Sequence, residues 1–143
     1  DKVDIESILQ ECKSQAEKTH PNLTVNIKTK TKKTEILGAR LIPIVFDNLM
    51  RNSAEYAKKD VTLTIEITSE DDVVFVMLSD DGPGIPKEIE SKLFEKGAST
   101  TGGGLGLYLT KKVIEGYGGK IEYLQYKRLP GTTFRIQLPA KRS

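Results

Sequence analysis

Residues 61–85 read VTLTIEITSEDDVVFVMLSDDGPGI, a stretch with two runs rich in β-branched and aromatic residues. The first run covers Val61 to Thr68, the second covers Val73 to Ser79, and Ser69-Glu70-Asp71-Asp72 lies between them. Two such runs joined by a short polar segment predict a β-hairpin. Asp80 directly follows the second strand, so the hairpin places a carboxylate at the start of a glycine-rich turn.

The segments around this hairpin alternate between helical and extended patterns. Apolar residues recur at helical spacing in three segments, which are residues 4–18, 39–57 and 107–117. Pro43 is compatible with the second of these helices because it lies in the opening turn. Further strands are predicted at residues 23–27, 120–126 and 132–138, with the turn Leu129-Pro130-Gly131 between the last two. This mixture of helices and strands predicts a two-layer α/β sandwich.

Length and charge restrict the classes of partner. A chain of 143 residues is long enough for a single domain, residues 1–143, that buries a core without disulfides or metals. Lys and Arg number 22 against 20 Asp and Glu, a net charge of +2 that argues against nucleic acid or an anionic membrane as the main partner.

The chain shows no apolar stretch long enough to cross a bilayer, and Asp1-Lys2-Val3-Asp4 does not resemble a secretory signal. The single cysteine, Cys12, cannot form an internal disulfide and falls within an amphipathic helical pattern, which predicts a buried or half-buried thiol. We therefore expect a cytoplasmic domain without direct membrane contact. A membrane anchor elsewhere in a larger parent protein is compatible with these features.

Two asparagines, Asn48 and Asn52, lie one turn apart in the predicted helix of residues 39–57. Positions i and i+4 share a helix face, so both amides point the same way, with Glu55 and Tyr56 one turn further on. An amide oxygen can join phosphate oxygens and waters around Mg²⁺, which prefers oxygen ligands. A solvated polar face is the alternative interpretation of so short a motif.

Asp80, Gly82 and Gly84 form the second motif. A carboxylate at the end of an apolar strand can accept a hydrogen bond from the exocyclic amine of adenine. The two glycines would let the backbone pass close to the base, and Pro83 would stiffen the turn. The same residues are also typical of an ordinary turn after a strand, so this motif alone leaves both interpretations open.

The third motif is Gly102-Gly103-Gly104-Leu105-Gly106-Leu107, directly before the predicted helix of residues 107–117. The first N–H groups of a helix lack intrahelical partners, so they can bind phosphate oxygens, and glycines allow the close approach. Residues 97–102 have the glycine spacing of a P-loop, but no Lys-Ser/Thr follows them, and the dinucleotide-binding spacing is absent. A flexible loop is the alternative.

Together these motifs resemble the ATP-binding catalytic domain of sensor histidine kinases, within the group that includes gyrase, Hsp-type chaperone and mismatch-repair ATPases. The resemblance spans nearly the whole chain. Its elements, in order, are an asparagine box at residues 48–54, a first glycine box at Asp80, Gly82 and Gly84, a phenylalanine box at residues 93–96, a second glycine box at Gly102, Gly104 and Gly106, and closing strands at residues 118–121 and 131–134. The resemblance implies a Bergerat-type α+β fold with a mixed, mostly antiparallel sheet on about three helices.

The resemblance also implies ATP and Mg²⁺ as cofactors. It implies Asn48 and Asn52 as catalytic residues, Asn52 as the Mg²⁺ ligand and Asp80 as the residue that reads adenine. The nucleotide-binding residues that it implies are Asn52, Tyr56, Asp80, Gly82, Gly84, Ile85, Phe94, Lys96, Thr101, Gly102, Gly103, Gly104, Leu105, Gly106 and Leu107.

The chain departs from the family pattern in two places. Many histidine kinases carry Lys or Arg three residues beyond the metal-binding asparagine, whereas this chain has Glu55, which cannot neutralise a phosphate. The segment between Phe94 and Gly102 is also short for an ATP lid, and the residues on which its closure would depend are Lys96, Gly97, Ser99, Thr100 and Thr101. Lys96 and Lys111 are candidates for the missing positive charge, with a solvated lysine as the alternative for each.

Hydrolytic relatives carry a glutamate one turn before the metal-binding asparagine, and this chain has Asn48 there. An amide has no useful basicity at neutral pH, and the adjacent Asp47 points about 100° away on the helix. We therefore expect transfer of the γ-phosphate to a histidine on a separate dimerisation domain, with a response regulator as an indirect partner. That acceptor domain is absent from this chain, and His20 is expected to be a surface turn residue.

Three alternatives remain open at this point. The first is a serine kinase of the anti-sigma type, which shares the same boxes. The second is a nucleotide-binding module without transfer, which Glu55 and the short lid would suit. The third is an ATPase clamp, which Asn48 disfavours because it cannot activate water.

Overall fold

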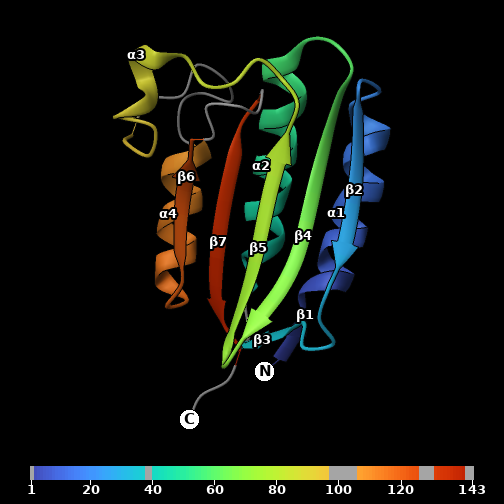
Figure 1. The fold of residues 1–143 in the computed structure, drawn as a ribbon, viewed down its shortest axis with the longest axis vertical. Helices are drawn as coiled ribbons and strands as arrows, with labels where there is room; N and C mark the ends of the chain where they lie inside the picture. Colours follow the sequence, from blue (N-terminus) through green and yellow to red (C-terminus); the bar gives the residue numbers. More distant parts are fainter. Residues whose placement is uncertain (1, 38–39, 97–105, 126–130, 141–143) are drawn as a thin grey trace.

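The sheet and the helices form two layers, and Figure 1 shows α1, α2 and α4 behind the strands. The computed structural model describes residues 2–37, 40–96, 106–125 and 131–140. Its helices are α1 (Ile5–Thr19), α2 (Ile42–Ala57), α3 (Lys87–Glu90) and α4 (Gly106–Gly116). Its strands are β1 (Lys2–Asp4), β2 (Leu23–Thr29), β3 (Glu35–Leu37), β4 (Val61–Glu70), β5 (Val73–Asp80), β6 (Lys120–Leu124) and β7 (Thr133–Pro139).

Five strands pair in the order β2-β4-β5-β7-β6. β2 runs parallel to β4, and the other three pairings are antiparallel. β1 and β3 form a separate antiparallel pair at one end of the molecule. The predicted α+β sandwich with a mixed, mostly antiparallel sheet is therefore confirmed.

The core lies between one face of the sheet and the helices. Along β4 the buried residues alternate with half-buried ones, and they are Val61, Leu63, Ile65 and Ile67. α2 adds buried residues at helical spacing to the same core, and these include Val45, Phe46, Leu49 and Met50. Full burial of each such side chain stabilises the fold by about 1.5–3 kcal/mol, so these matched periodicities favour contact between the two layers.

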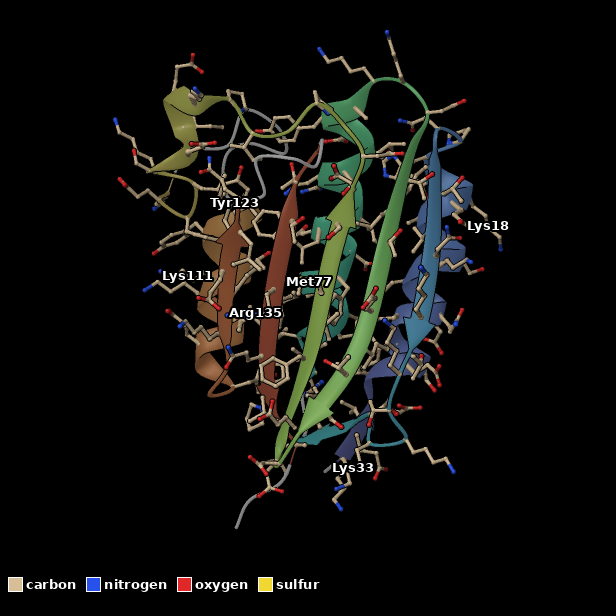
Figure 2. All side chains as sticks on the ribbon, viewed as in Figure 1. Lys18, Lys33, Met77, Lys111, Tyr123 and Arg135 are labelled. Carbon is tan, nitrogen blue, oxygen red and sulfur yellow. The ribbon has the colours of Figure 1, made fainter. Side chains whose placement is uncertain are left out.

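The other sheet face points away from the helices. Figure 2 shows Met77 of β5 and Arg135 of β7 on this face, and the two residues are register partners. The Arg135 guanidinium donates to the Glu122 carboxylate on β6, with Nη2 and Oε1 2.6 Å apart. Such polar pairs keep this face compatible with water.

Three short elements were not predicted from the sequence, namely β1, β3 and α3. β1 and β3 have three residues each and are held by their pairing to one another, for example Val3 opposite Ile36. α3 is a single turn of four residues, too short to show a helical period. Ser69 and Glu70 belong to β4, so the hairpin turn is only Asp71-Asp72, with Asp71 in the left-handed region at φ 54°.

Cys12 of α1 is buried, as predicted. Burial raises the pKa of its thiol to about 12, and the neighbouring Asp47 carboxylate of α2 adds to that rise. Cys12 is therefore a packing residue with little thiolate character at neutral pH. Among the residues that the structure describes, no helix combines the length and the apolar composition that crossing a bilayer requires.

Candidate functional site

A hollow of about 360 Å³, including its open mouth, lies between α2, the end of β5 and the start of α4. The described residues that line it are Leu49, Asn52, Ser53, Tyr56, Asp80, Pro83, Gly84, Ile85, Leu107, Thr132 and Phe134. Residues from the asparagine box, the first glycine box and the end of the second glycine box thus meet in space.

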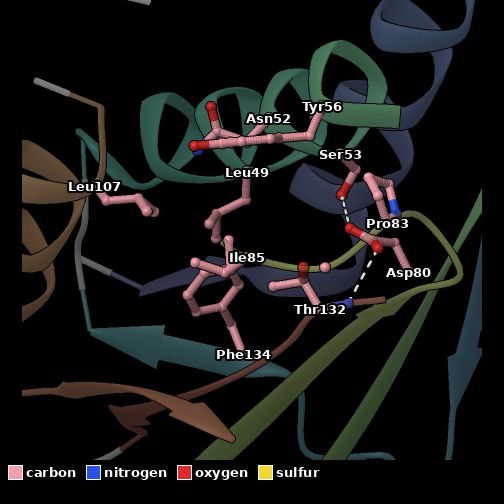
Figure 3. A pocket seen from close by; sticks show the side chains of 11 residues that line it. Leu49, Asn52, Ser53, Tyr56, Asp80, Pro83, Ile85, Leu107, Thr132 and Phe134 are labelled. Atoms are coloured by element: carbon pink, nitrogen blue, oxygen red, sulfur yellow. Dashed lines mark hydrogen bonds between the residues drawn. The ribbon is translucent and has the colours of Figure 1, made fainter. Parts of the chain in front are cut away.

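Asp80 lies at one side of this hollow, and Leu107 lies at the opposite side (Figure 3). The Ser53 hydroxyl donates to Asp80 Oδ2 at 2.8 Å. The backbone N–H groups of Gly82 and Thr132 donate to Asp80 Oδ1 at 3.0 and 3.2 Å. Burial raises the pKa of the Asp80 carboxyl, and these three hydrogen bonds oppose that rise. The carboxylate is therefore held in one orientation by α2, by its own turn and by the residue before β7.

Gly131 makes this arrangement possible by close contact with the Asp80 backbone. A Cβ on Gly131 would lie 1.8 Å from the Asp80 carbonyl oxygen, and its φ of +91° is in the left-handed region. Gly84 also adopts a positive φ, +84°, as it carries the chain past Gly131. Both positions need glycine because the backbone is left-handed there, and at Gly131 no side chain would fit.

The two asparagines of α2 differ in their surroundings. Asn52 is 7% exposed and lines the hollow, with Tyr56 one turn further along. Asn48 is half-buried and is not among the lining residues, and its Oδ1 accepts a hydrogen bond from Arg51 Nη2 at 3.3 Å. Although the two asparagines were predicted to share a helix face, Asn52 faces the hollow and Asn48 is hydrogen-bonded to Arg51.

Apolar side chains form much of the remaining surface of the hollow. Leu49, Ile85, Leu107 and Phe134 contribute it from four different segments. Phe94 does not line the hollow but packs edge-on against Phe134, with ring centroids 6.1 Å apart and an interplanar angle of 67°. It supports the apolar side of the hollow from behind.

Lys96 and Lys111 lie around a second, more open hollow with Phe94 and Tyr108. Lys111 Nζ is 3.9 Å from Glu115 Oε2 and 5.6 Å from the centre of the Phe94 ring. In this structure neither lysine lines the hollow that contains Asp80, so their predicted phosphate contacts remain predictions.

Part of the predicted phosphate-binding loop, Thr101, Gly102, Gly103, Gly104 and Leu105, lies outside the described residues. Gly106 is the first residue of α4 and is buried. The end of this loop therefore reaches the hollow through Leu107.

Five lining residues were missing from the set predicted from the sequence, and they are Leu49, Ser53, Pro83, Thr132 and Phe134. Leu49 and Ser53 flank predicted residues on the same helix, and Pro83 sits inside the predicted turn. Thr132 and Phe134 could be identified only from the pairing of β5 with β7, which the sequence alone does not reveal.

Residues 39–142 match the family of histidine kinase-, DNA gyrase B- and HSP90-like ATPases. The chain belongs to this ATPase family. Within it the chain is an ATP-binding catalytic domain of the sensor histidine kinase type, since several relatives and solved structures are of that kind. The catalytic domain is 35% identical over 106 residues to a probable C4-dicarboxylate sensor kinase of Halalkalibacterium halodurans, covering 69% of this chain and 20% of the relative.

The catalytic domain is also 32% identical over 109 residues to the sensor histidine kinase WalK of Bacillus subtilis, covering 68% of this chain and 17% of WalK. Its fold matches the solved catalytic domain of histidine kinase ThkA with a TM-score of 0.86 and 25% identity, covering 99% and 98% of the two chains. The chain thus spans no more than a fifth of these two sensor kinases but matches an isolated catalytic domain almost end to end.

The raised pKa of Asp80 makes a prediction about stability. A carboxyl with a raised pKa binds its proton more tightly in the folded state than in the unfolded state. The resulting stabilisation of the folded domain is complete when the pH is below the ordinary pKa of 3.8, and it is lost as the pH rises through the folded-state pKa. Asp80→Asn removes this dependence while an amide can still accept from Gly82 and Thr132. The free energy of unfolding of the variant relative to the unmodified domain should therefore fall as the pH is lowered from about 7 to about 4.

Urea unfolding followed by circular dichroism would measure this difference. Asp81→Asn, at the exposed neighbouring carboxylate that accepts from the Thr62 N–H, is the matched control. A relative stability of the Asp80 variant that increased on acidification would contradict the assignment of Asp80 as a carboxylate destabilised by burial.

Proposed function

We propose that the catalytic domain binds Mg²⁺-ATP in the hollow and transfers the γ-phosphate to a histidine on a separate dimerisation domain of its parent kinase, from which a response regulator would receive it. The observation that carries this proposal is the convergence of Asn52, Asp80 and Leu107 on one hollow from three distant segments. The kinase relatives support the signalling role.

Adenine fits the end of the hollow at Asp80. The base would lie between apolar side chains such as Ile85 and Phe134, and its exocyclic amine would donate to the Asp80 carboxylate. Ser53 and Thr132 already fix the orientation of that carboxylate, so little ordering would be needed on binding.

Mg²⁺ fits the amide of Asn52, which is buried and lines the same hollow. Within the described ranges, no three His, Cys, Asp or Glu residues come together as a ready-made metal cage. The remaining ligands would therefore come from the nucleotide phosphates and water, as is usual for this ion. When bound, the ion would neutralise charge on the phosphate oxygens.

Transfer suits this site better than hydrolysis because α2 supplies no base where water would be activated. Asn48 is an amide and already accepts a hydrogen bond from Arg51. The Asp47 carboxylate lies beside Cys12 and so faces α1. His20 caps the C-terminal end of α1 by donating its backbone N–H to the Ala16 carbonyl, and it is not among the described residues that line the hollow.

The transfer can be tested by mixing the catalytic domain with the separately expressed dimerisation domain of its parent kinase and γ-labelled ATP. We expect acid-labile phosphohistidine on the added domain, and Asn52→Ala should abolish it. Acid-stable phosphate would identify a serine kinase instead. ATP binding without labelling of the partner would identify a nucleotide-binding module and contradict the proposed transfer.

Asp80→Asn should weaken ATP binding by about ten-fold or more, because an amide is a weaker acceptor and can present a donor to the adenine amine. Calorimetry with Mg²⁺-ATP would measure the loss, and Asp81→Asn is again the control because it makes the same chemical change on an exposed residue. Unchanged affinity in the Asp80 variant would refute the adenine contact.

Asn52→Ala should reduce ATP affinity by about ten-fold in the presence of Mg²⁺ and much less in excess chelator, since the amide acts through the metal. The informative quantity is the difference between the loss of ATP affinity measured with Mg²⁺ and the loss measured in excess chelator. Equal losses with and without Mg²⁺ would show that Asn52 is not a metal ligand.

A further inference from the structure

Arg51 lies on α2 between the two asparagines and reaches toward the start of α4. A Cβ on Gly106, the first residue of α4, would be 3.8 Å from Arg51 Nη2. The same nitrogen donates to Asn48 Oδ1 at 3.3 Å. Since Leu107 lies across the hollow from Asp80 in Figure 3, Arg51 belongs to the end that is remote from the adenine-reading residue.

The charge of Arg51 is poorly compensated by the described residues. Its Nε is shielded from water and has no hydrogen-bond partner among them. None of the described carboxylates forms an ion pair with it, and the start of α4 carries a positive partial charge of its own. A shielded guanidinium N–H without a partner is costly, so this environment favours an anion beside Arg51.

The neighbouring carboxylates on α2 do not fill this role. Asp47, one turn before Arg51, lies beside Cys12 of α1. Glu55, one turn after Arg51, is exposed. Lys111 of α4, which lies at the second hollow, already pairs with Glu115 and covers the Phe94 ring.

We propose, on the basis of the ATP-binding function proposed above, that Arg51 contacts the terminal phosphate of the bound nucleotide and that Asn48 positions its guanidinium. A guanidinium is always charged and presents a planar set of donors that matches phosphate oxygens. Asn48 holds one terminal nitrogen, which restricts the side chain to the gap between α2 and α4. Arg51, directly before Asn52, would thus supply the positive charge that many histidine kinases carry at the position of Glu55.

The test is the ratio of ATP affinity to ADP affinity, measured by calorimetry with Mg²⁺ on Arg51→Met, Arg51→Lys and Arg40→Met. Arg40 is an exposed residue in the turn before α2, so its substitution makes the same change of charge away from the hollow. A contact with the terminal phosphate predicts a ratio lowered by about ten-fold in Arg51→Met, less in Arg51→Lys and not at all in Arg40→Met. Partial unfolding of a variant would lower its apparent affinities for ATP and for ADP by the same factor. A lowered ratio of the two affinities therefore cannot result from unfolding.

If Arg51→Met kept the ratio of ATP affinity to ADP affinity unchanged, because it altered neither affinity or lowered both equally, the proposal would be overturned. Arg51 would then be only a structural partner of Asn48. This failure is distinguishable from a failure of the proposed function. If the unmodified domain bound neither nucleotide, the ATP-binding function itself would be wrong. If it bound both and Arg51→Met kept the ratio, only the role of Arg51 would be wrong.

Discussion

The half-buried carboxylate of Asp80 is the constraint on which the site depends. A charge in this position is tolerated only when its oxygens are satisfied, and here the donors come from Ser53 on α2, from Gly82 and from Thr132. These bonds join the helix layer to the strand layer at the hollow. They require the backbone at Gly131 to touch that of Asp80, which only glycine permits. The residue that gives the site its chemistry is thus also one that ties its segments together.

The second constraint is the packing of α4 along α2. At one end the Leu41 N–H donates to the Tyr117 hydroxyl at 3.3 Å, and at the other end Gly106 lies against Arg51. Because both ends of α4 are placed against α2, the start of α4 stands at a defined position relative to Asn52. The end of the hollow remote from Asp80 is therefore assembled by helix–helix packing, whereas the Asp80 end is assembled by strand pairing and hydrogen bonds.

A hollow whose two ends are each held in a fixed place suits a domain that would act mainly by positioning a ligand. The described residues around the hollow offer an amide, a carboxylate engaged in hydrogen bonds, hydroxyl groups and apolar surfaces, and none of these is a strong base. Such a set of groups suits the function proposed above, in which the domain would orient a nucleotide and a separate domain would supply the acceptor. Two glycines with positive φ, Gly84 and Gly131, lie at the Asp80 end, where the backbone of Gly131 comes close to that of Asp80.

The sequence by itself determined the three long helices, the five strands of the main sheet and the four boxes, because these depend on periodicity, turn residues and short motifs that can be read locally. It also identified Asn52, Asp80 and Leu107, which the structure brings to one hollow. Only the tertiary structure decided that Asn48 turns to Arg51, that Lys96 and Lys111 surround a different hollow, and that β1 pairs with β3. These outcomes depend on contacts between residues far apart in the chain, and a helical or extended period fixes the face on which a side chain lies but not the neighbour that it meets.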